Sequence, residues 1–230
     1  MNKNPIYCAI DTSSIENATV LVEQIAPHIG GIKVGLEFFT SCGMNGIEKL
    51  AKFDLPMFID LKLHDIPNTV KNSLKNILAF EPKYTTLHIS GGSEMLKECI
   101  NLKNENNSYT NLIGVTVLTS FNENSISEIG ISSSLSDCVQ NLSNLAFNCG
   151  LDGIVCSPLE IKKIKEKFSN NLKLVVPGIR DSLNDHNDQK RTLSAKEAID
   201  SGADIIVIGR PITQANSPAD AARIFHQSIK

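Results

Sequence analysis

The chain has 230 residues, of which 41% are hydrophobic and 20% charged, and its formal net charge is −3. This composition excludes a disordered or fibrous chain, and a chain of this length can bury one large core. The small acidic excess leaves no broad basic surface, so we expect neither nucleic acid nor a membrane as a partner. Any anion that the protein binds must be met by a local cluster of donors.

The eight predicted strands are short, continuous runs of apolar and β-branched residues, a pattern typical of strands buried on both faces. They are expected at residues 5–10, 30–36, 55–62, 85–90, 112–119, 152–158, 172–179 and 203–209. Helical patterns lie between them, at residues 16–29, 46–53, 68–80, 94–102, 136–150, 158–168, 194–202 and 219–229. Eight alternating strand and helix units predict a parallel sheet with right-handed crossovers that closes into an α/β fold, the (β/α)8 TIM barrel.

The alternative fold is a doubly wound open sheet, which would need a glycine-rich phosphate turn after the first strand. The segment AIDTSSIENA at that position has no glycine. No linker or change of composition divides the chain, so we expect a single catalytic domain over residues 1–230.

The cysteines and histidines follow no pattern typical of a metal site or a disulfide framework. The six cysteines contain no Cys-x-x-Cys pair, and the five histidines have no ligand-like spacing. The N-terminal segment is too polar for a signal peptide, and no later run approaches the ~20 apolar residues of a membrane span. We therefore expect a cytoplasmic protein with reduced thiols.

Charged residues gather where the predicted strands end, which is the active-site face of a barrel. Asp11 follows the first strand, Lys33 lies in the second, and Asp60 and Lys62 lie in the third. Since strand side chains alternate, Asp60 and Lys62 share one face, and Lys33 and Asp65 are close enough to extend them into a chain of alternating charge. Either these charges serve a reaction, or they form an ion-pair network that only neutralises itself at the rim.

Two histidines near these charges are interpreted differently. His64 lies on the turn between Lys62 and Asp65, and His88 lies in the fourth predicted strand. Neither has a second ligand nearby in the sequence, so we interpret both as structural residues, and not as bases or metal ligands.

The last two predicted strands end in motifs that indicate a phosphate site. The motif PGIR contains Pro177, Gly178 and Arg180, and the motif GRP contains Gly209 and Arg210. In barrels, the loops after strands seven and eight commonly bind phosphate through backbone N–H groups, and an arginine adds a fork of donors.

A polar stretch without periodicity follows at residues 181–194 and includes Gln189. It is long enough for a lid over a ligand, although a surface loop is the other interpretation.

The motif DLKLHDIPNTV is preceded by IKVG and followed by VTVLTS, VVPGIR, NDQKR and IGRPI. This series of motifs closely resembles that of the orotidine 5′-phosphate decarboxylase family. The resemblance extends from Asp11 to Arg210. It implies conversion of orotidine 5′-phosphate to uridine 5′-phosphate (UMP), the last step of de novo pyrimidine synthesis, without metal or organic cofactor. It also implies a homodimer.

The resemblance implies a role for each matching residue. Lys62 is then the proton donor, Asp60 faces the substrate carboxylate, and Lys33 bridges Asp60 and the ribose. The other implied substrate contacts are Asp11 at the ribose, Thr119 or Ser120 at the pyrimidine, Pro177, Gly178, Arg180, Gln189, Gly209 and Arg210 around the phosphate, and Asp65, Ile66 and Thr69 in the partner subunit's site.

One departure from the family pattern lies in residues 181–192, which have no proline after Arg180 and no glycine before DQKR. Two alternatives remain open. A metal-dependent sugar-phosphate decarboxylase or aldolase shares the Asp-x-Lys-x-x-Asp core and would be sensitive to EDTA. A non-catalytic nucleotide-binding barrel would bind the ligand without turning it over.

Overall fold

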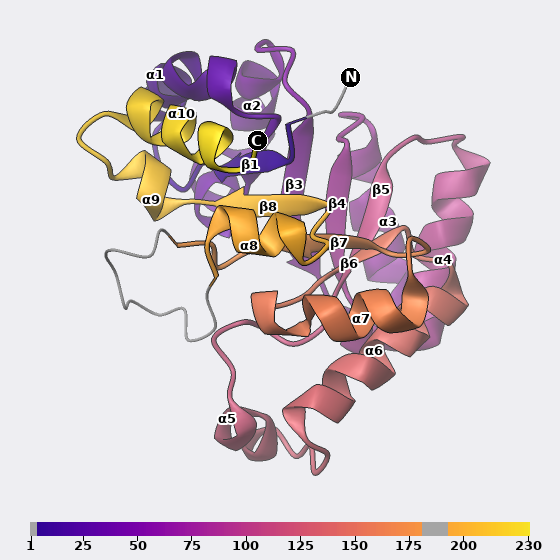
Figure 1. Ribbon diagram of the computed structural model, residues 1–230. Helices are drawn as coiled ribbons and strands as arrows, with labels where there is room; N and C mark the ends of the chain where they lie inside the picture. Colours follow the sequence, from indigo (N-terminus) through magenta and orange to yellow (C-terminus); the bar gives the residue numbers. More distant parts are fainter. Residues whose placement is uncertain (1–3, 181–192) are drawn as a thin grey trace.

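The eight predicted strands form one closed parallel barrel in the computed structural model, which describes residues 4–180 and 193–230 (Figure 1). Each strand pairs in parallel with the next along the chain, and β1 pairs with β8 to close the ring. The predicted (β/α)8 barrel is therefore confirmed. The strands are β1 Ile6–Ala9, β2 Gly31–Val34, β3 Met57–Leu63, β4 Tyr84–His88, β5 Asn111–Val115, β6 Gly153–Val155, β7 Lys173–Val176 and β8 Ile205–Ile208.

Helices surround the barrel and cover the outer faces of the strands (Figure 1). The longer ones are α1 Ile15–Ile25, α2 Leu36–Ala51, α3 Pro67–Leu78, α4 Gly92–Glu105, α6 Leu135–Cys149, α7 Ile161–Phe168 and α10 Pro218–Ser228. Shorter ones are α5 Glu123–Glu128, α8 Ala195–Asp200, α9 Arg210–Thr213 and the single 3-10 turns η1 Ala26–His28, η2 Ile89–Gly91 and η3 Pro158–Glu160. None of the helices in the described ranges is long and apolar enough to cross a membrane.

Four helices begin at a serine that caps them. Ser14, Ser134, Ser194 and Ser217 precede α1, α6, α8 and α10, and each hydroxyl accepts a hydrogen bond from the backbone N–H three residues later. Such caps satisfy one of the unpaired donors at a helix N-terminus, which defines where the helix starts.

The alternation of side chains divides the apolar residues of the strands between two layers. The larger layer packs between the strands and the helices, and the smaller one fills the barrel interior. Tyr7, Phe58 and Tyr84 meet edge to face inside the barrel, with ring centroids 5.5–6.4 Å apart. These packed rings fill the barrel interior below the carboxyl ends of the strands.

Two aspartates fasten the opposite, N-terminal face of the barrel. Asp152, directly before β6, accepts a hydrogen bond from the backbone N–H of Leu112 at 2.7 Å and pairs with Lys103 at 2.6 Å. Asp204, directly before β8, accepts from the N–H of Leu174 at 2.8 Å. Each carboxylate therefore ties the start of its own strand to the strand before it.

Some predicted boundaries are wrong. The second helix was expected only over 46–53, but α2 begins at Leu36 and bends at Gly43, whose φ is +57°. The fifth strand was expected to reach residue 119 but ends at Val115. The apolar run continues beyond the last ladder pair, so composition alone does not show where pairing stops.

Candidate active site

Four charged residues meet at the carboxyl ends of β1, β2 and β3. Lys33 Nζ lies 3.5 Å from Asp60 Oδ2 and 3.6 Å from Asp11 Oδ1. Lys62 Nζ donates a hydrogen bond of 2.8 Å to the same Asp60 Oδ2. Asp60 and Lys33 are buried, whereas about half of the Asp11 side chain is exposed. The expected meeting of Lys33, Asp60 and Lys62 is confirmed, and Asp11 joins them.

The backbone of β3 is irregular where it carries these side chains. The pairing of β3 with β4 shifts register between Ile59 and Leu63, and Lys62 has a φ of +51°, which is rare for a residue with a Cβ. The Lys62 N–H donates to Thr86 Oγ1 at 2.9 Å, and that hydroxyl donates to Asp60 Oδ1 at 2.9 Å. Thr86 was not among the predicted site residues, because it lies inside β4 and not at its end.

The environment of Asp60 favours its ionised form. Burial acts against ionisation and is the largest single influence on its pKa. The charges of Lys33 and Lys62 and the hydrogen bonds from Lys62 and Thr86 together outweigh burial and hold the pKa of Asp60 below its usual range. Asp60 is therefore a fixed negative charge between two ammonium groups at neutral pH.

Gly35 provides the space for one of these groups. A Cβ at this position would lie 2.8 Å from Lys33 Nζ and 3.5 Å from Asp11 Oδ1. Any other residue would push the Lys33 ammonium away from its two carboxylates.

A cavity of about 260 Å³ opens beside these charges. Its volume lies just below the range of about 300–1,000 Å³ that is usual for small-molecule sites. Its polar wall contains Lys33, Asp60, Lys62, Thr119 and Ser120, and Pro177 also lines it; all six were predicted as site residues. Its apolar wall, which the sequence analysis did not single out, includes Phe58, Val115, Val117, Leu118, Val155, Val175 and Val207. This wall gives the cavity one apolar side, the apolar slot, which suits a ring.

Thr119 and Ser120 reach this cavity from a loop and not from a strand, since they follow the last residue of β5 by four and five positions. Their predicted place at a strand end is wrong, while their predicted place at the site is consistent with the cavity.

Asp65, Ile66 and Thr69 lie apart from this cluster, at the start of α3. All three are exposed, and the apolar side chain of Ile66 is 67% exposed. Asp65 Oδ1 accepts a hydrogen bond from the Ile66 N–H at 2.7 Å. Among the ion pairs of residues 4–180 and 193–230, none includes Asp65. Within one chain, the predicted run of alternating charges therefore stops at Lys62.

The proposed phosphate residues lie at the ends of the neighbouring strands β7 and β8. Gly178 has a φ of +77°, a conformation that favours glycine. Arg180 donates from Nη1 to the Ile179 carbonyl at 2.9 Å and from its backbone N–H to the Leu193 carbonyl at 3.0 Å. Pro177 lines the cavity, and Gly209 and Arg210 lie where β8 passes into α9. Gln189 lies outside the described residues.

The rings of His64 and His88 contact each other near this cluster, with centroids 5.3 Å apart and planes tilted by 35°. Burial lowers the pKa of His88, and the neighbouring His64 and Lys62 lower it further. His88 is therefore neutral at pH 7.

Within the described ranges, no three histidine, cysteine, aspartate or glutamate residues lie together in an arrangement that could hold a metal ion. The oxygens of Asp60 are instead occupied by hydrogen bonds from Lys62 and Thr86.

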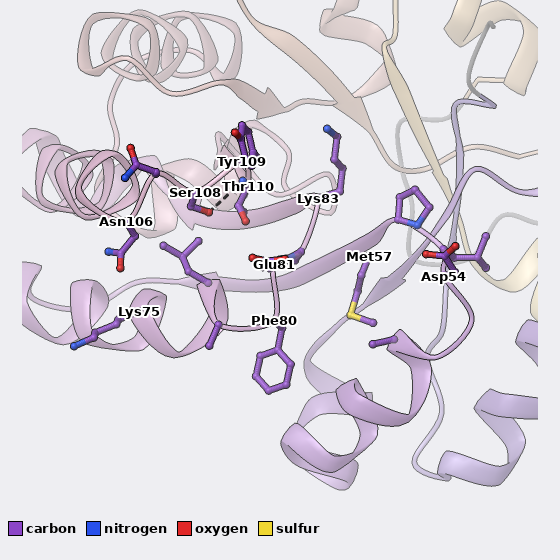
Figure 2. Close-up of a pocket in the computed structure, with 17 residues that line it drawn as sticks. Asp54, Met57, Lys75, Phe80, Glu81, Lys83, Asn106, Ser108, Tyr109 and Thr110 are labelled. Carbon is purple, nitrogen blue, oxygen red and sulfur yellow. Dashed lines mark hydrogen bonds between the residues drawn. The ribbon is translucent and has the colours of Figure 1, made fainter.

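A larger cavity, of about 730 Å³, lies at the opposite end of the barrel, among the loops that precede β3, β4 and β5. Its wall includes Met57, Glu81 and Thr110, and Figure 2 shows that Lys75 and Lys83 extend from it in different directions. Because its charged groups do not converge, we place the chemistry at the smaller cavity.

The chain is similar to known proteins over nearly its whole length. Residues 4–225 match the family described as orotidine 5′-phosphate decarboxylase / HUMPS. A protein named orotidine 5′-phosphate decarboxylase from Wolbachia sp. subsp. Brugia malayi (strain TRS) is 46% identical over 226 residues, which cover 98% of this chain and 99% of that protein. A protein of the same name from Ehrlichia chaffeensis is 44% identical and covers all of this chain and 98% of its own length.

A crystal structure agrees with these sequence matches. That of orotidine 5′-phosphate decarboxylase from Lactobacillus acidophilus superimposes with a TM-score of 0.87 at 33% identity, covering 99% of both chains. The family match, these relatives and the barrel with its charged cluster lead to one conclusion. The chain belongs to the orotidine 5′-phosphate decarboxylase family.

Proposed function

We propose that the protein decarboxylates orotidine 5′-phosphate to UMP in pyrimidine synthesis, without a metal or an organic cofactor, and that Lys62 donates the proton. Its relatives carry the name of this reaction. One observation supports the assignment of this reaction to the charged cluster. The Lys62 ammonium lies at the wall of a cavity with an apolar slot, 2.8 Å from the buried Asp60 carboxylate, and the buried Lys33 ammonium lies 3.5 Å from the same oxygen.

The reaction explains why an ammonium group is required. When the bond from C6 to the carboxylate breaks, CO₂ leaves and the electron pair stays on C6 in an sp² orbital that is not conjugated with the ring carbonyls. The ring therefore supplies no electron sink. A fixed positive charge aimed at C6 stabilises the developing anion, and the same group then gives it a proton. Lys62 supplies both, so no further group is needed.

Asp60 contributes by repulsion in the bound substrate. A carboxylate placed ~4 Å from the substrate carboxylate raises the energy of the ground state by roughly 4 kcal/mol at an effective dielectric constant near 20. This repulsion disappears as CO₂ leaves. It is too small to account for the whole rate enhancement of an enzyme, which is typically at least ~8 kcal/mol.

The remaining stabilisation comes from binding energy far from C6. Arg180, Gly209 and Arg210, at the ends of β7 and β8, are the proposed phosphate ligands, and Gln189 joins them in this proposal. Binding of the phosphate fixes the pyrimidine in the slot and places C6 against Lys62, so that remote binding energy lowers the barrier.

We further propose a cytoplasmic homodimer in which Asp65, Ile66 and Thr69 complete the partner's site. The exposure of these three residues at the rim of the barrel supports this arrangement. Mixing the inactive variants Lys62→Ala and Asp65→Asn tests it. A mixed dimer has one site with both native residues, so random mixing restores about a quarter of the wild-type activity. No recovery after subunit exchange would contradict shared sites.

The direct test of the proposed function is the change in absorbance when the purified protein is given orotidine 5′-phosphate. We expect turnover that EDTA does not reduce. Turnover abolished by EDTA and restored by a divalent cation would favour a metal-dependent sugar-phosphate type of site. Binding of UMP without any turnover of the substrate would favour a non-catalytic nucleotide-binding barrel.

A further inference from the structure

We propose that Thr86 is a positioning residue whose buried hydroxyl holds the Asp60 carboxylate and the Lys62 backbone in the arrangement that decarboxylation requires. The inference rests on the proposed function, because it takes the roles of Asp60 and Lys62 from it. Thr86 itself is not part of the cavity wall, so it acts through its two neighbours and not on the substrate.

The position of Thr86 is set by the alternation of side chains in β4. Tyr84 points into the barrel interior, where it contacts Tyr7 and Phe58. Thr86, two residues later, faces the same side, and its exposed fraction is 0%. Its hydroxyl therefore enters the barrel wall directly beneath the charged cluster, where water does not reach it.

The hydroxyl is used fully, as donor and as acceptor. It donates its single proton to Asp60 Oδ1 at 2.9 Å and accepts the Lys62 backbone N–H at 2.9 Å. One atom thus joins the two residues to which the proposed chemistry assigns opposite charges.

The acceptor function compensates for the irregular backbone of β3. Ile59 is in register with Thr85, but Leu63 is in register with Leu87, so three residues of β3 stand opposite the single residue Thr86. In this bulge the Lys62 N–H bonds to the Thr86 side chain instead of a β4 carbonyl. The hydrogen bond supports a positive φ that is unfavourable in a residue with a Cβ.

The donor function sets the orientation of the Asp60 carboxylate. With Oδ1 bound to Thr86, Oδ2 faces both ammonium groups, at 2.8 Å from Lys62 and 3.5 Å from Lys33. Without the hydroxyl, the carboxylate is free to rotate, and the Lys62 N–H is left without a partner. Both changes move the proton donor relative to C6, and small displacements of this kind reduce the reaction rate strongly.

The test compares Thr86→Val, which removes the hydroxyl and keeps the branched shape, with Thr85→Val as the matched control. Thr85 is the adjacent residue of the same strand, is equally buried, and its hydroxyl has no hydrogen-bond partner. Because a hydrogen bond to a charged group contributes ~1.5–3 kcal/mol, we expect Thr86→Val to lower kcat by about 10- to 100-fold. Thr86→Ser keeps a hydroxyl and should stay within about fivefold of the wild type.

Three further readouts separate positioning from general damage to the fold. The Kd for UMP should be similar in all variants, since no ligand contact is removed. The Tm of Thr86→Val should be lower, because the Lys62 N–H loses its partner, so kcat is compared at a temperature at which every variant is folded. Thr85→Val should keep the wild-type kcat. The hydrogen bond from Thr86 is among the influences that lower the pKa of Asp60, so its loss raises that pKa and moves the acid limb of kcat to higher pH. The charged groups that act on Asp60 are Lys33 and Lys62, and His88 is the other titratable group that interacts with it. All three are the same in every variant.

An unchanged kcat in Thr86→Val, or an equal loss in Thr85→Val, would overturn the inference while leaving the proposed function intact. If Thr86→Val does not fold, Thr86→Ala also removes the hydroxyl and must show the same loss. A wild-type protein that does not decarboxylate orotidine 5′-phosphate would instead overturn the proposed function, and this inference with it.

Discussion

The replacement Asp60→Asn tests how the charged cluster contributes to stability. The asparagine oxygen can still accept the hydrogen bond from Thr86, so the change removes the charge and, at the Oδ2 position, the acceptor of the Lys62 hydrogen bond. At the observed 3.5 Å and 2.8 Å, and with an effective dielectric constant near 20, the attractions to Lys33 and Lys62 are about 5 and about 6 kcal/mol. Burial of Asp60 offsets much of this gain, but its lowered pKa means that the ionised form is stabilised on folding.

We therefore expect Asp60→Asn to lower the free energy of unfolding at neutral pH by about 3–5 kcal/mol, as for other buried pairs that lose one partner. The pH dependence has a definite sign. The pKa of Asp60 is lower in the folded than in the unfolded protein, so its contribution is complete above the unfolded value of ~3.9 and is lost as pH falls through the folded value. The difference between wild type and variant should be constant from about pH 8 to pH 5 and shrink below about pH 4.

Urea unfolding at one protein concentration measures this difference. Asp54→Asn is the matched control, since Asp54 is an exposed aspartate in a turn with a φ of +51° that asparagine also tolerates, and its effect should stay within about 0.5 kcal/mol. An Asp60→Asn variant as stable as the wild type at pH 7 would refute the reasoning, because the attractions would then not exceed the cost of burial.

Two other replacements separate binding from folding. Arg210→Ala should reduce kcat/KM for orotidine 5′-phosphate by at least about tenfold but change turnover of a phosphate-free analogue much less, since the proposed contact is to the phosphate; equal losses on both substrates would argue against that role. Asp152→Ala removes the acceptor of the Leu112 N–H and the partner of Lys103, so we expect a loss of about 1–3 kcal/mol in unfolding free energy with an unchanged kcat. A change in kcat at equal stability would show that the N-terminal face of the barrel affects the reaction at the opposite face.

Much of the fold follows from the sequence because one constraint acts eight times. Parallel strands must be buried on both faces and joined by helices, so continuous apolar runs alternating with helical patterns leave few other topologies. The positions of Lys33, Asp60 and Lys62 then follow from the rule that barrel sites lie at the carboxyl ends of strands. Helix boundaries are harder to predict, as α2 shows. The residues after its first turn are poor helix formers, so the sequence pattern does not reveal where the helix starts. In the structure, the buried side chain of Phe38 anchors that first turn.

The details of the site depend on tertiary geometry that no local pattern encodes. The two-residue alternation of strand side chains correctly predicts that Asp60 and Lys62 lie on the same side of β3. It does not predict the bulge in β3 or the positive φ of Lys62. Thr86 looked like any threonine in a strand, and only the register shift brings its hydroxyl to both residues. Thr119 and Ser120 reach the cavity through the course of a loop, which sequence periodicity does not describe.

The replacement Lys62→Ala tests the central claim most directly. Its ammonium is the proposed proton donor, and its hydrogen bond to Asp60 places it at the cavity wall. The measurement is turnover of orotidine 5′-phosphate beside the Kd for UMP, in the same preparation. We expect turnover to fall by at least about 10³-fold, because both the charge at C6 and the proton are lost, while UMP still binds. Decarboxylation at the wild-type rate would contradict the assignment of Lys62 as the proton donor.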